Sequence, residues 1–485
     1  MVASSRDLDA AIAATRFGLG AKAGEIAAAR SDPRGWLKAQ VRREGADAFA
    51  TDGQSGRQRL AAFRDYRREK QEQRRQNQAA GDANATDEDM GAVKMAREAI
   101  RQAAIGDVAA RLQLAIDTEA SFRERWALFW ANHFTVSTSK GELATLAGPY
   151  ENEALRPHVF GRFAELLVAA ETHPAMLLYL DQAQSVGPDS RAAMFVKAGG
   201  QRPGPFARPG GGAKRVPGLN ENLAREIMEL HTVGVNGGYT QADVTEFARA
   251  LTGLSVGGPR DMGSEDAVVF RENAHEPGTR KVLGVSYRDD GKAQAGAILV
   301  DLAAKPQTAK FVCAKIARHF VADDPPPAVT ARLEKAWMAS GGDLARVAEA
   351  LIDAPEAWTP TPAKLKTPYE FVVSSHRAVG APPRNPQQVA GVLNALGQRP
   401  FSAPSPKGWP DEAAPWAASD AIVKRMQFAQ GLGAQVGPNV QSPTQLADAA
   451  LGARLTPASA TAIARAESRP EAVALLLMSP EFQRR

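Results

Sequence analysis

The stretch PGLNENLAREIMELHTVGVNGGYTQADVTEFARALTG, residues 217–253, predicts two helices joined by a glycine-rich loop. Apolar residues recur in its first half at the spacing of one helix face, at Leu223, Ile227 and Leu230. Gly234 stands where a left-handed residue would end a helix, and Thr240 with Asp243 forms a capping box that begins the next one. We therefore expect a helix-loop-helix unit in a mainly α-helical protein.

Composition agrees with that fold class over the whole chain. The 485 residues are 44% hydrophobic and 23% charged, which is typical of a soluble globular protein, while the 6% aromatic content favours helices over sheets. We expect a single large multi-helix domain over residues 1–485, with a helical lobe from about residue 290. One small β-hairpin is expected, with strands at 267–271 and 280–287 around the turn HEPGT.

Charge, hydropathy and cysteine content exclude several classes of protein. The net charge of +5 is small for this length and gives little reason to expect a nucleic-acid partner. No run of about 18 apolar residues predicts a transmembrane helix. The N-terminal residues include Asp7 and Asp9 and lack the basic-then-apolar order of a signal peptide. This predicts a cytoplasmic protein, or one that reaches the periplasm or is exported by association with a partner. The single cysteine, Cys313, excludes a disulfide within the chain.

Two segments depart from the helical pattern of the rest. Residues 57–97 are highly charged, with six Lys or Arg residues between Arg64 and Arg75. Such a segment is typical of an arm that contacts RNA or a membrane, or of a solvated helix followed by a flexible loop, and we expect the second. Residues 186–217 are rich in Gly and Pro and carry several basic side chains, so we expect a long loop that can act as a lid beside the helix-loop-helix.

Seven histidines are spread through the chain without the spacing of a zinc motif, so a metal site would need ligands from distant segments. The first helix of the opening stretch is the best source. Glu226 and Glu229 share one of its faces, and His231 lies on the apolar side. His133, which follows an aromatic cluster, is a further candidate. The alternative is structural, since Arg225 can pair with Glu229 along the helix and His231 can fill the core.

Two further patterns suggest binding or catalysis. The loop NGGYTQAD, residues 236–243, is similar to the second half of a calcium-binding EF-hand loop, although Thr232 and Gly234 stand where the first carboxylates are needed. We therefore expect an EF-hand-like turn without calcium. His275 and Glu276, on the expected hairpin turn, are a candidate general acid-base pair or else solvated turn residues.

Further motifs occur in an order that one protein family shares. They are RFGLGA at 16–21, RWALFWANHFTVS at 125–137, RPHVFGRFAELL at 156–167, HPAMLLYLD at 173–181, HEPGTRKVLG at 275–284 and KGWPD at 407–411. With residues 217–253, they make the chain resemble the bacterial domain of unknown function 1800 family over nearly its whole length. The resemblance implies no particular activity. It does imply a genomic neighbour, because genes for such proteins often adjoin one for a sulfatase-like protein of the domain of unknown function 1501 family.

These observations lead to two predictions of function. The first, which we favour, is a non-catalytic assembly or export partner of that sulfatase-like protein. The alternative is a metal-dependent enzyme, a hydrolase or an oxidoreductase, with a His/Glu site in the helical core and a divalent metal as cofactor. The catalytic candidates are then Glu229, His231 and His275, and the metal-ligand candidates are Glu226, Glu229, His231 and His133.

Overall fold

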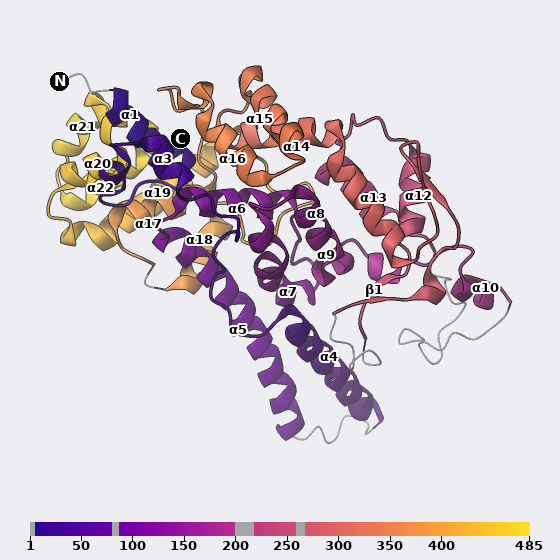
Figure 1. Cartoon of the computed structure of the whole chain (residues 1–485). Coiled ribbons are helices and arrows are strands. Elements are labelled where there is room, and N and C mark those ends of the chain that lie inside the picture. The colour runs from indigo at the N-terminus through magenta and orange to yellow at the C-terminus, as the bar shows by residue number, and fades with distance from the viewer. Residues whose placement is uncertain (1–4, 80–86, 199–217, 259–266, 384) are drawn as a thin grey trace.

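A computed structural model describes residues 5–79, 87–198, 218–258, 267–383 and 385–485 of the chain. The structure is 65% helical, and its described strands form two small antiparallel two-stranded sheets, which confirms the mainly α fold class. In Figure 1 the helices form an elongated body, from which one pair of long helices projects. Every helix that the structure describes is too short or too polar to cross a membrane.

The main body takes its helices from three stretches of the chain. The N-terminal helices are α1 (Ser5–Ile12), α2 (Glu25–Ala29) and α3 (Pro33–Lys38). The central helices are α6 (Ser121–His133), α7 (Leu143–Tyr150), α8 (Phe163–Thr172), α9 (Pro174–Tyr179), α11 (Asn222–Glu226) and α12 (Gln241–Leu251). Four helices follow the strands: α13 (Lys292–Ala304), α14 (Pro306–Phe320), α15 (Pro327–Ser340) and α16 (Leu344–Asp353). Their apolar faces meet in one large hydrophobic core.

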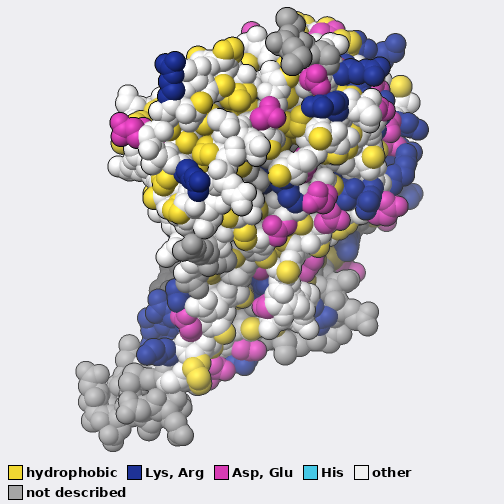
Figure 2. All heavy atoms as spheres, turned by 90° about the vertical axis from the view of Figure 1, so that its left-hand side faces the viewer, with side chains coloured by type: hydrophobic (Ala, Val, Ile, Leu, Met, Phe, Trp, Pro, Cys, Tyr) yellow, Lys and Arg dark blue, Asp and Glu magenta, His cyan; other side chains and the backbone are white. Residues whose placement is uncertain are grey.

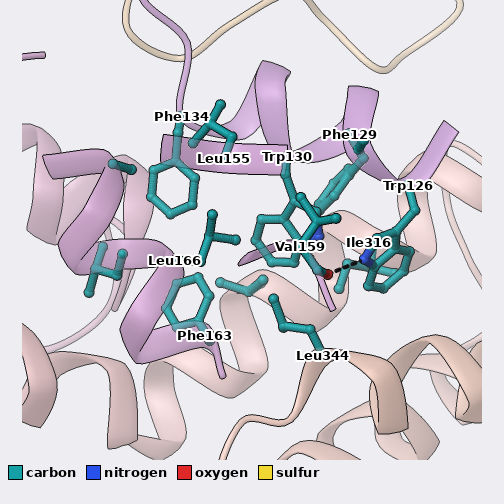
Figure 3. Packing of buried hydrophobic residues seen from close by; sticks show 14 of the residues in the cluster. Trp126, Phe129, Trp130, Phe134, Leu155, Val159, Phe163, Leu166, Ile316 and Leu344 are labelled. Carbon is teal, nitrogen blue, oxygen red and sulfur yellow. Dashed lines mark hydrogen bonds between the residues drawn. The ribbon is translucent and has the colours of Figure 1, made fainter. Parts of the chain in front are cut away.

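The centre of this core is built on α6. Trp126 and Trp130 are fully buried, and Trp126 stacks on Phe160 with ring centroids 5.9 Å apart. The Trp126 indole donates a hydrogen bond of 2.7 Å to the Val159 carbonyl, so its one polar atom stays satisfied in the core (Figure 3). Helix α6 is therefore held firmly, and side chains along it reach the two clusters of polar groups described below.

The C-terminal helices form a second, smaller core. They are α17 (Pro368–Val379), α19 (Ser419–Val436), α20 (Pro443–Leu451), α21 (Pro457–Ala464), α22 (Arg469–Met478) and α23 (Pro480–Gln483). Helix α18 (Pro386–Ala395) belongs to a separate small cluster, in which Leu393 packs with Leu112 and Val372. The buried apolar residues of this core lie between Phe371 and Phe482. In Figure 1 this group lies beside the N-terminal helices. Arg16 Nη1 donates to the Ala357 carbonyl at 2.7 Å, and Arg377 Nε donates to the Gly20 carbonyl at 2.8 Å. The lobe expected from about residue 290 stays a prediction.

The observed strand pairing differs from the expected hairpin. β1 (Leu254–Val256) pairs with β2 (Val268–Phe270), and β3 (Arg280–Val282) pairs with β4 (Val285–Tyr287). The pairing expected across the HEPGT turn was therefore wrong. The deciding turn is Leu283-Gly284, whose φ angles of 47° and 82° are the positive values that a two-residue hairpin turn requires. Because leucine rarely adopts positive φ, the sequence did not indicate this turn.

The projecting pair consists of α4 (Gly56–Ala79) and α5 (Asp87–Asp117), and we call it the arm (Figure 1). Buried apolar residues of α4 anchor its base, with Leu60, Phe63 and Tyr66 among them. There Arg59 also forms a buried ion pair of 2.5 Å with Asp107 of α5. The charged segment expected at 57–97 falls within the arm, and its residues 80–86 lie outside the described part.

The Gly/Pro-rich segment expected as a loop at 186–217 is described only in its first part. It contains the short helix α10 (Arg191–Lys197). Residues 199–217 lie outside the described residues. The lid expected there therefore stays a prediction.

Candidate functional site

His231 ends the π-helical turn η5 (Ile227–His231), which continues α11 without a break. Its side chain is fully buried, which agrees with its expected place on the apolar side of the helix. The Nδ1 atom lies 2.7 Å from Oε1 of Glu171 on α8, and that carboxylate is also fully buried. The histidine thus lies beside an acid from another helix, which the sequence did not indicate. Neither ring nitrogen of His231 and neither carboxylate oxygen of Glu171 makes a hydrogen bond of good geometry within the described residues.

His133, at the end of α6, lies against His231, with ring centroids 5.8 Å apart. Its Nε2 is 3.1 Å from the His231 carbonyl oxygen, and its Nδ1 is 2.9 Å from Nζ of Lys315 on α14. A neutral ring satisfies both contacts when Nε2–H donates to the carbonyl and Nδ1 accepts from Lys315. Burial and the Lys315 charge hold the pKa of His133 well below its usual value, and burial lowers the pKa of Lys315 to about 8.

Glu226 and Glu229 lie on the less buried side of the same helix, where both are half-buried. Burial raises the pKa of Glu226, and the nearby His231 opposes that shift. The Glu229 carboxylate is hydrogen-bonded to Tyr239. In the part of the chain that the structure describes, no group of three or more His, Cys, Asp or Glu side chains is placed to hold a metal ion. The ligand set named from the sequence therefore stays a prediction.

His275 lies in different surroundings. Its side chain is buried, with Nδ1 2.8 Å from the Thr252 carbonyl oxygen and Nε2 3.6 Å from Oδ1 of Asp289. Glu276 is buried as well, and its carboxylate accepts a hydrogen bond of 2.8 Å from the Asp189 backbone N–H. The two residues are therefore not solvated turn residues, because each connects neighbouring loops.

The loop between α11 and α12 contains the residues that were expected to end the first helix and to begin the second. Gly234 has a φ of 81°, and the capping box of Thr240 and Asp243 is present. The Asp243 carboxylate accepts hydrogen bonds from the backbone N–H of Thr240, at 2.8 Å, and of Leu283, at 2.7 Å. Because both of its oxygens bind backbone N–H groups, the similarity to an EF-hand loop does not extend to the ligand position of Asp243.

A pocket of about 100 Å³ lies where α5, α6, α7, α14 and α17 meet the KGWPD segment, and we call it the His319 pocket. His319 Nδ1 and Asp411 Oδ1 are 2.8 Å apart, as in a hydrogen bond that the imidazole donates. Burial lowers the pKa of His319 to about 4, although Asp411 opposes the shift. The ring is therefore neutral at neutral pH, with a lone pair on Nε2. That atom is buried and makes no hydrogen bond within the described residues.

One side chain fixes the KGWPD segment to α6. Asn132 Nδ2 donates to the Trp409 carbonyl at 2.9 Å, and Asn132 Oδ1 accepts from the Trp409 N–H at 2.8 Å. Gly408 has a φ of 86°, and a Cβ there would lie 2.4 Å from the Asn132 carbonyl oxygen, so this turn needs glycine. Lys364 Nζ donates to the Asp411 carbonyl. These contacts set the position of the Asp411 carboxylate.

Two arginines line the same pocket, and each pairs with a buried carboxylate. Arg125 Nη2 donates to Glu370 Oε1 at 2.8 Å, and Arg485 pairs with the same carboxylate. The Nε atom of Arg125 is buried and has no hydrogen-bond partner among the described residues. Arg111 Nε donates to Glu151 Oε2 at 2.9 Å. Within the described part of the chain, this guanidinium forms its hydrogen bonds through Nε alone.

Comparison with known proteins identifies the family. The model described as "Protein of unknown function (DUF1800)" matches residues 12–484. The chain belongs to the DUF1800 family. The resemblance inferred from the ordered motifs is thus confirmed over nearly the whole chain. Neither the curated proteins nor the solved structures include a match to this DUF1800 protein.

The motifs of this DUF1800 protein contribute to both clusters. RWALFWANHFTVS supplies Arg125 and Asn132 to the His319 pocket and His133 to the contact with His231. KGWPD supplies Asp411. The sequence did not indicate the partner of Asp411, because His319 is 92 residues away in a helix without a local motif. The buried apolar face of α14 was the only local signal, and it does not distinguish a binding residue from a core residue.

Proposed function

We propose that this DUF1800 protein is a non-catalytic assembly partner of another protein, which it contacts through the arm. The observation that carries the proposal is that the outer part of the arm adds nothing to either core of the chain. After Tyr66, no described side chain of α4 is buried, and the same holds on α5 before Asp107. The two helices pack against each other, and their polar outer faces leave a surface that a second molecule can cover.

The charge of helix α4, and not that of α5 with its four basic and six acidic residues, supports a partner with an acidic surface. Helix α4 carries eight Lys and Arg residues against three Asp and Glu. Four of these basic residues are exposed on its outer part: Arg67, Arg68, Arg74 and Arg75. In Figure 2, Lys and Arg side chains gather on the lower, projecting part of the molecule, next to the grey tip. Met95 of α5 is 68% exposed and adds an apolar side chain to the surface of the arm. A basic surface with an apolar residue suits an acidic protein surface.

The partner that we propose is the sulfatase-like protein of the domain of unknown function 1501 family. The support is the family membership of this chain together with the gene order that the resemblance implies. In this proposal an acidic patch of the sulfatase-like protein packs against α4. The complex would then be sensitive to ionic strength, because exposed charge pairs are screened by salt.

The experiment is co-expression with the product of the neighbouring gene, followed by affinity measurement on the purified pair. Reversing the four exposed arginines of α4 to glutamate should weaken binding roughly tenfold or more, as expected for several surface charge pairs. The matched control reverses four exposed basic residues outside the arm: Lys310, Lys335, Arg346 and Arg465. Equal loss in both variants, or a complex unaffected by the arm variant, would contradict the proposal. Fractionating cells with and without the partner gene tests whether the two proteins are exported together.

The metal-dependent enzyme is the alternative, and one observation favours it. The His231–Glu171 pair lies close enough to Glu226 for both charges to affect the pKa of that carboxyl group. Elemental analysis of protein purified without chelator or affinity metal is the test. We expect substoichiometric metal, because the described residues bring no three ligands together. About one equivalent of a divalent metal, lost when Glu226 and His231 are both replaced, would instead favour the enzyme.

A further inference from the structure

Arg111 offers the His319 pocket two hydrogen-bond donors that no described residue uses. Its Nε donates to Glu151, whereas Nη1 and Nη2 make no hydrogen bond within the described part of the chain. These two atoms are not fully buried, and 13% of the side chain remains accessible. The free edge of a guanidinium carries two parallel N–H groups, which match the two oxygens of one carboxylate.

The neighbours of the guanidinium place its free edge at the pocket. Its central carbon lies 5.0 Å from the centroid of the Tyr369 ring and 5.3 Å from that of the Phe401 ring. Glu151 and both aromatic residues line the pocket, as Arg111 does. The rings pack against the guanidinium and Glu151 occupies Nε. Nη1 and Nη2 are therefore the part of Arg111 that a molecule in the pocket can reach.

Arg111 keeps its charge, and the acids near it are already paired. Burial lowers its pKa, but the charge of Glu151 outweighs burial and raises the pKa above the usual value. Glu151 also lies 3.6 Å from Nη2 of Arg156, and Glu370 pairs with Arg125. Because each of these carboxylates has a cationic partner, they repel an anion in the pocket less than unpaired carboxylates would.

The size and lining of the pocket suit a short apolar chain. Leu128, Ala131 and Val136, from α6 and the segment that follows it, contribute an apolar part of the wall. The volume of about 100 Å³ is several times the space that one water needs, so the pocket has room for several non-hydrogen atoms. An alkyl group attached to the carboxylate can therefore be buried against this wall.

The backbone of Phe401 is strained where its ring lies against Arg111. Its φ angle is 51°, a value that a bulky residue rarely adopts. The Phe401 carbonyl accepts a hydrogen bond of 2.8 Å from the Thr138 N–H, which fixes this turn to the main body. Strain of this kind costs free energy and is concentrated at binding and active sites. It keeps the aromatic ring over the guanidinium.

We propose that the His319 pocket binds a short-chain aliphatic monocarboxylate. Nη1 and Nη2 of Arg111 each donate to one oxygen of the carboxylate, and the alkyl chain packs against the apolar wall. Glu151, Tyr369 and Phe401 already hold the guanidinium in position. Such preorganisation reduces the entropy that ligand binding has to offset.

Isothermal titration calorimetry with acetate, propanoate and butanoate, at neutral pH and low ionic strength, tests the proposal. Affinity should rise about fourfold with each methylene group that is added, since burying one contributes that much. Butanamide has the shape of butanoate without its charge, and it should bind at least about tenfold more weakly. Absence of saturable butanoate binding, equal affinity for butanamide, or no rise from acetate to butanoate would overturn the proposal.

Two variants test the two parts of the site. Arg111→Lys keeps the positive charge beside Glu151 but loses the fork, so butanoate affinity should fall about tenfold. The matched control is Arg101→Lys on the same helix, where the guanidinium pairs with Glu98 outside the pocket, and it should bind butanoate like the wild type. Ala131→Leu fills part of the cavity and should weaken butanoate binding more than acetate binding.

Thermal melts report whether each variant is folded. If Arg111→Lys is folded and binds butanoate like the wild type, the proposal fails. If that variant does not fold, Ala131→Leu decides, because unchanged affinity for both acids in a folded variant would place their binding outside the pocket.

Discussion

Replacing His231 with alanine distinguishes a structural role from a metal-binding one. The substitution removes the imidazole whose Nδ1 lies 2.7 Å from Oε1 of the fully buried Glu171 carboxylate. Removing one member of a buried pair typically costs about 3–5 kcal/mol. The entropy of unfolding is about 2.1 cal/mol/K per residue, so this chain of 485 residues has an entropy of unfolding of about 1 kcal/mol/K if it unfolds in one step. The midpoint of thermal unfolding should therefore fall by about 3–5 °C.

Glu229→Ala is the matched comparison, because Glu229 belongs to the same helix but is only half-buried. The substitution removes only the hydrogen bond to Tyr239, which is worth about 0.5–1.5 kcal/mol, so the midpoint should fall by only about 1 °C. Circular dichroism melts and elemental analysis would be done on the same preparations. The reasoning is refuted if His231→Ala melts like the wild type, and the metal alternative gains if that variant has also lost a bound metal.

Three further predictions concern the His319 pocket and the core. The pKa of His319 is about 4 in the folded protein and 6.5 for an ordinary histidine, so between these pH values His319 binds a proton only in the unfolded chain. The free energy of unfolding should therefore rise with pH over this range and fall as the pH is lowered. Denaturant unfolding at several pH values should show a flatter slope for His319→Gln than for the wild type. Gly408→Ala places a Cβ 2.4 Å from the Asn132 carbonyl oxygen at a positive φ, so thermal melts should show a lower midpoint of unfolding. An unchanged midpoint would argue against a fixed KGWPD segment. Arg156→Met breaks a buried bidentate pair with Glu124, in which both contacts are 2.8 Å. The midpoint of thermal unfolding should fall by about 3–5 °C, and adding Glu124→Leu should partly restore it. A double variant that melts no higher than Arg156→Met would contradict this account.

Local signals in the sequence predicted the helices well. The capping box at Thr240 and the left-handed Gly234 both depend on contacts within a few residues, and both are present. The apolar spacing that placed His231 on the buried side of its helix is a property of one helix alone. Such features can be predicted because their physical cause lies in the same short segment.

Contacts between distant segments could not be predicted in this way. Nothing near His231 indicates that Glu171 of α8 would reach it, and nothing near Asp411 indicates His319. The predicted hairpin pairing was wrong for a different reason. The sequence HEPGT has the composition of a turn, whereas the actual turn uses Leu283, a residue with no preference for positive φ. Tertiary packing decided that turn, and packing is not visible in local composition.

The long-range arginine contacts have a consequence for the order in which the protein can fold during synthesis. The donor to the Gly20 carbonyl is Arg377, which follows 357 residues later, and Arg16 donates to a carbonyl 341 residues further along. At a typical rate of about 5–20 residues per second, a ribosome needs roughly 20 to 70 seconds to make that intervening chain. The N-terminal helices leave the ribosome long before these partners exist. Their contacts with these partners therefore form late, only after synthesis has passed Arg377, when the last hundred or so residues remain to be made.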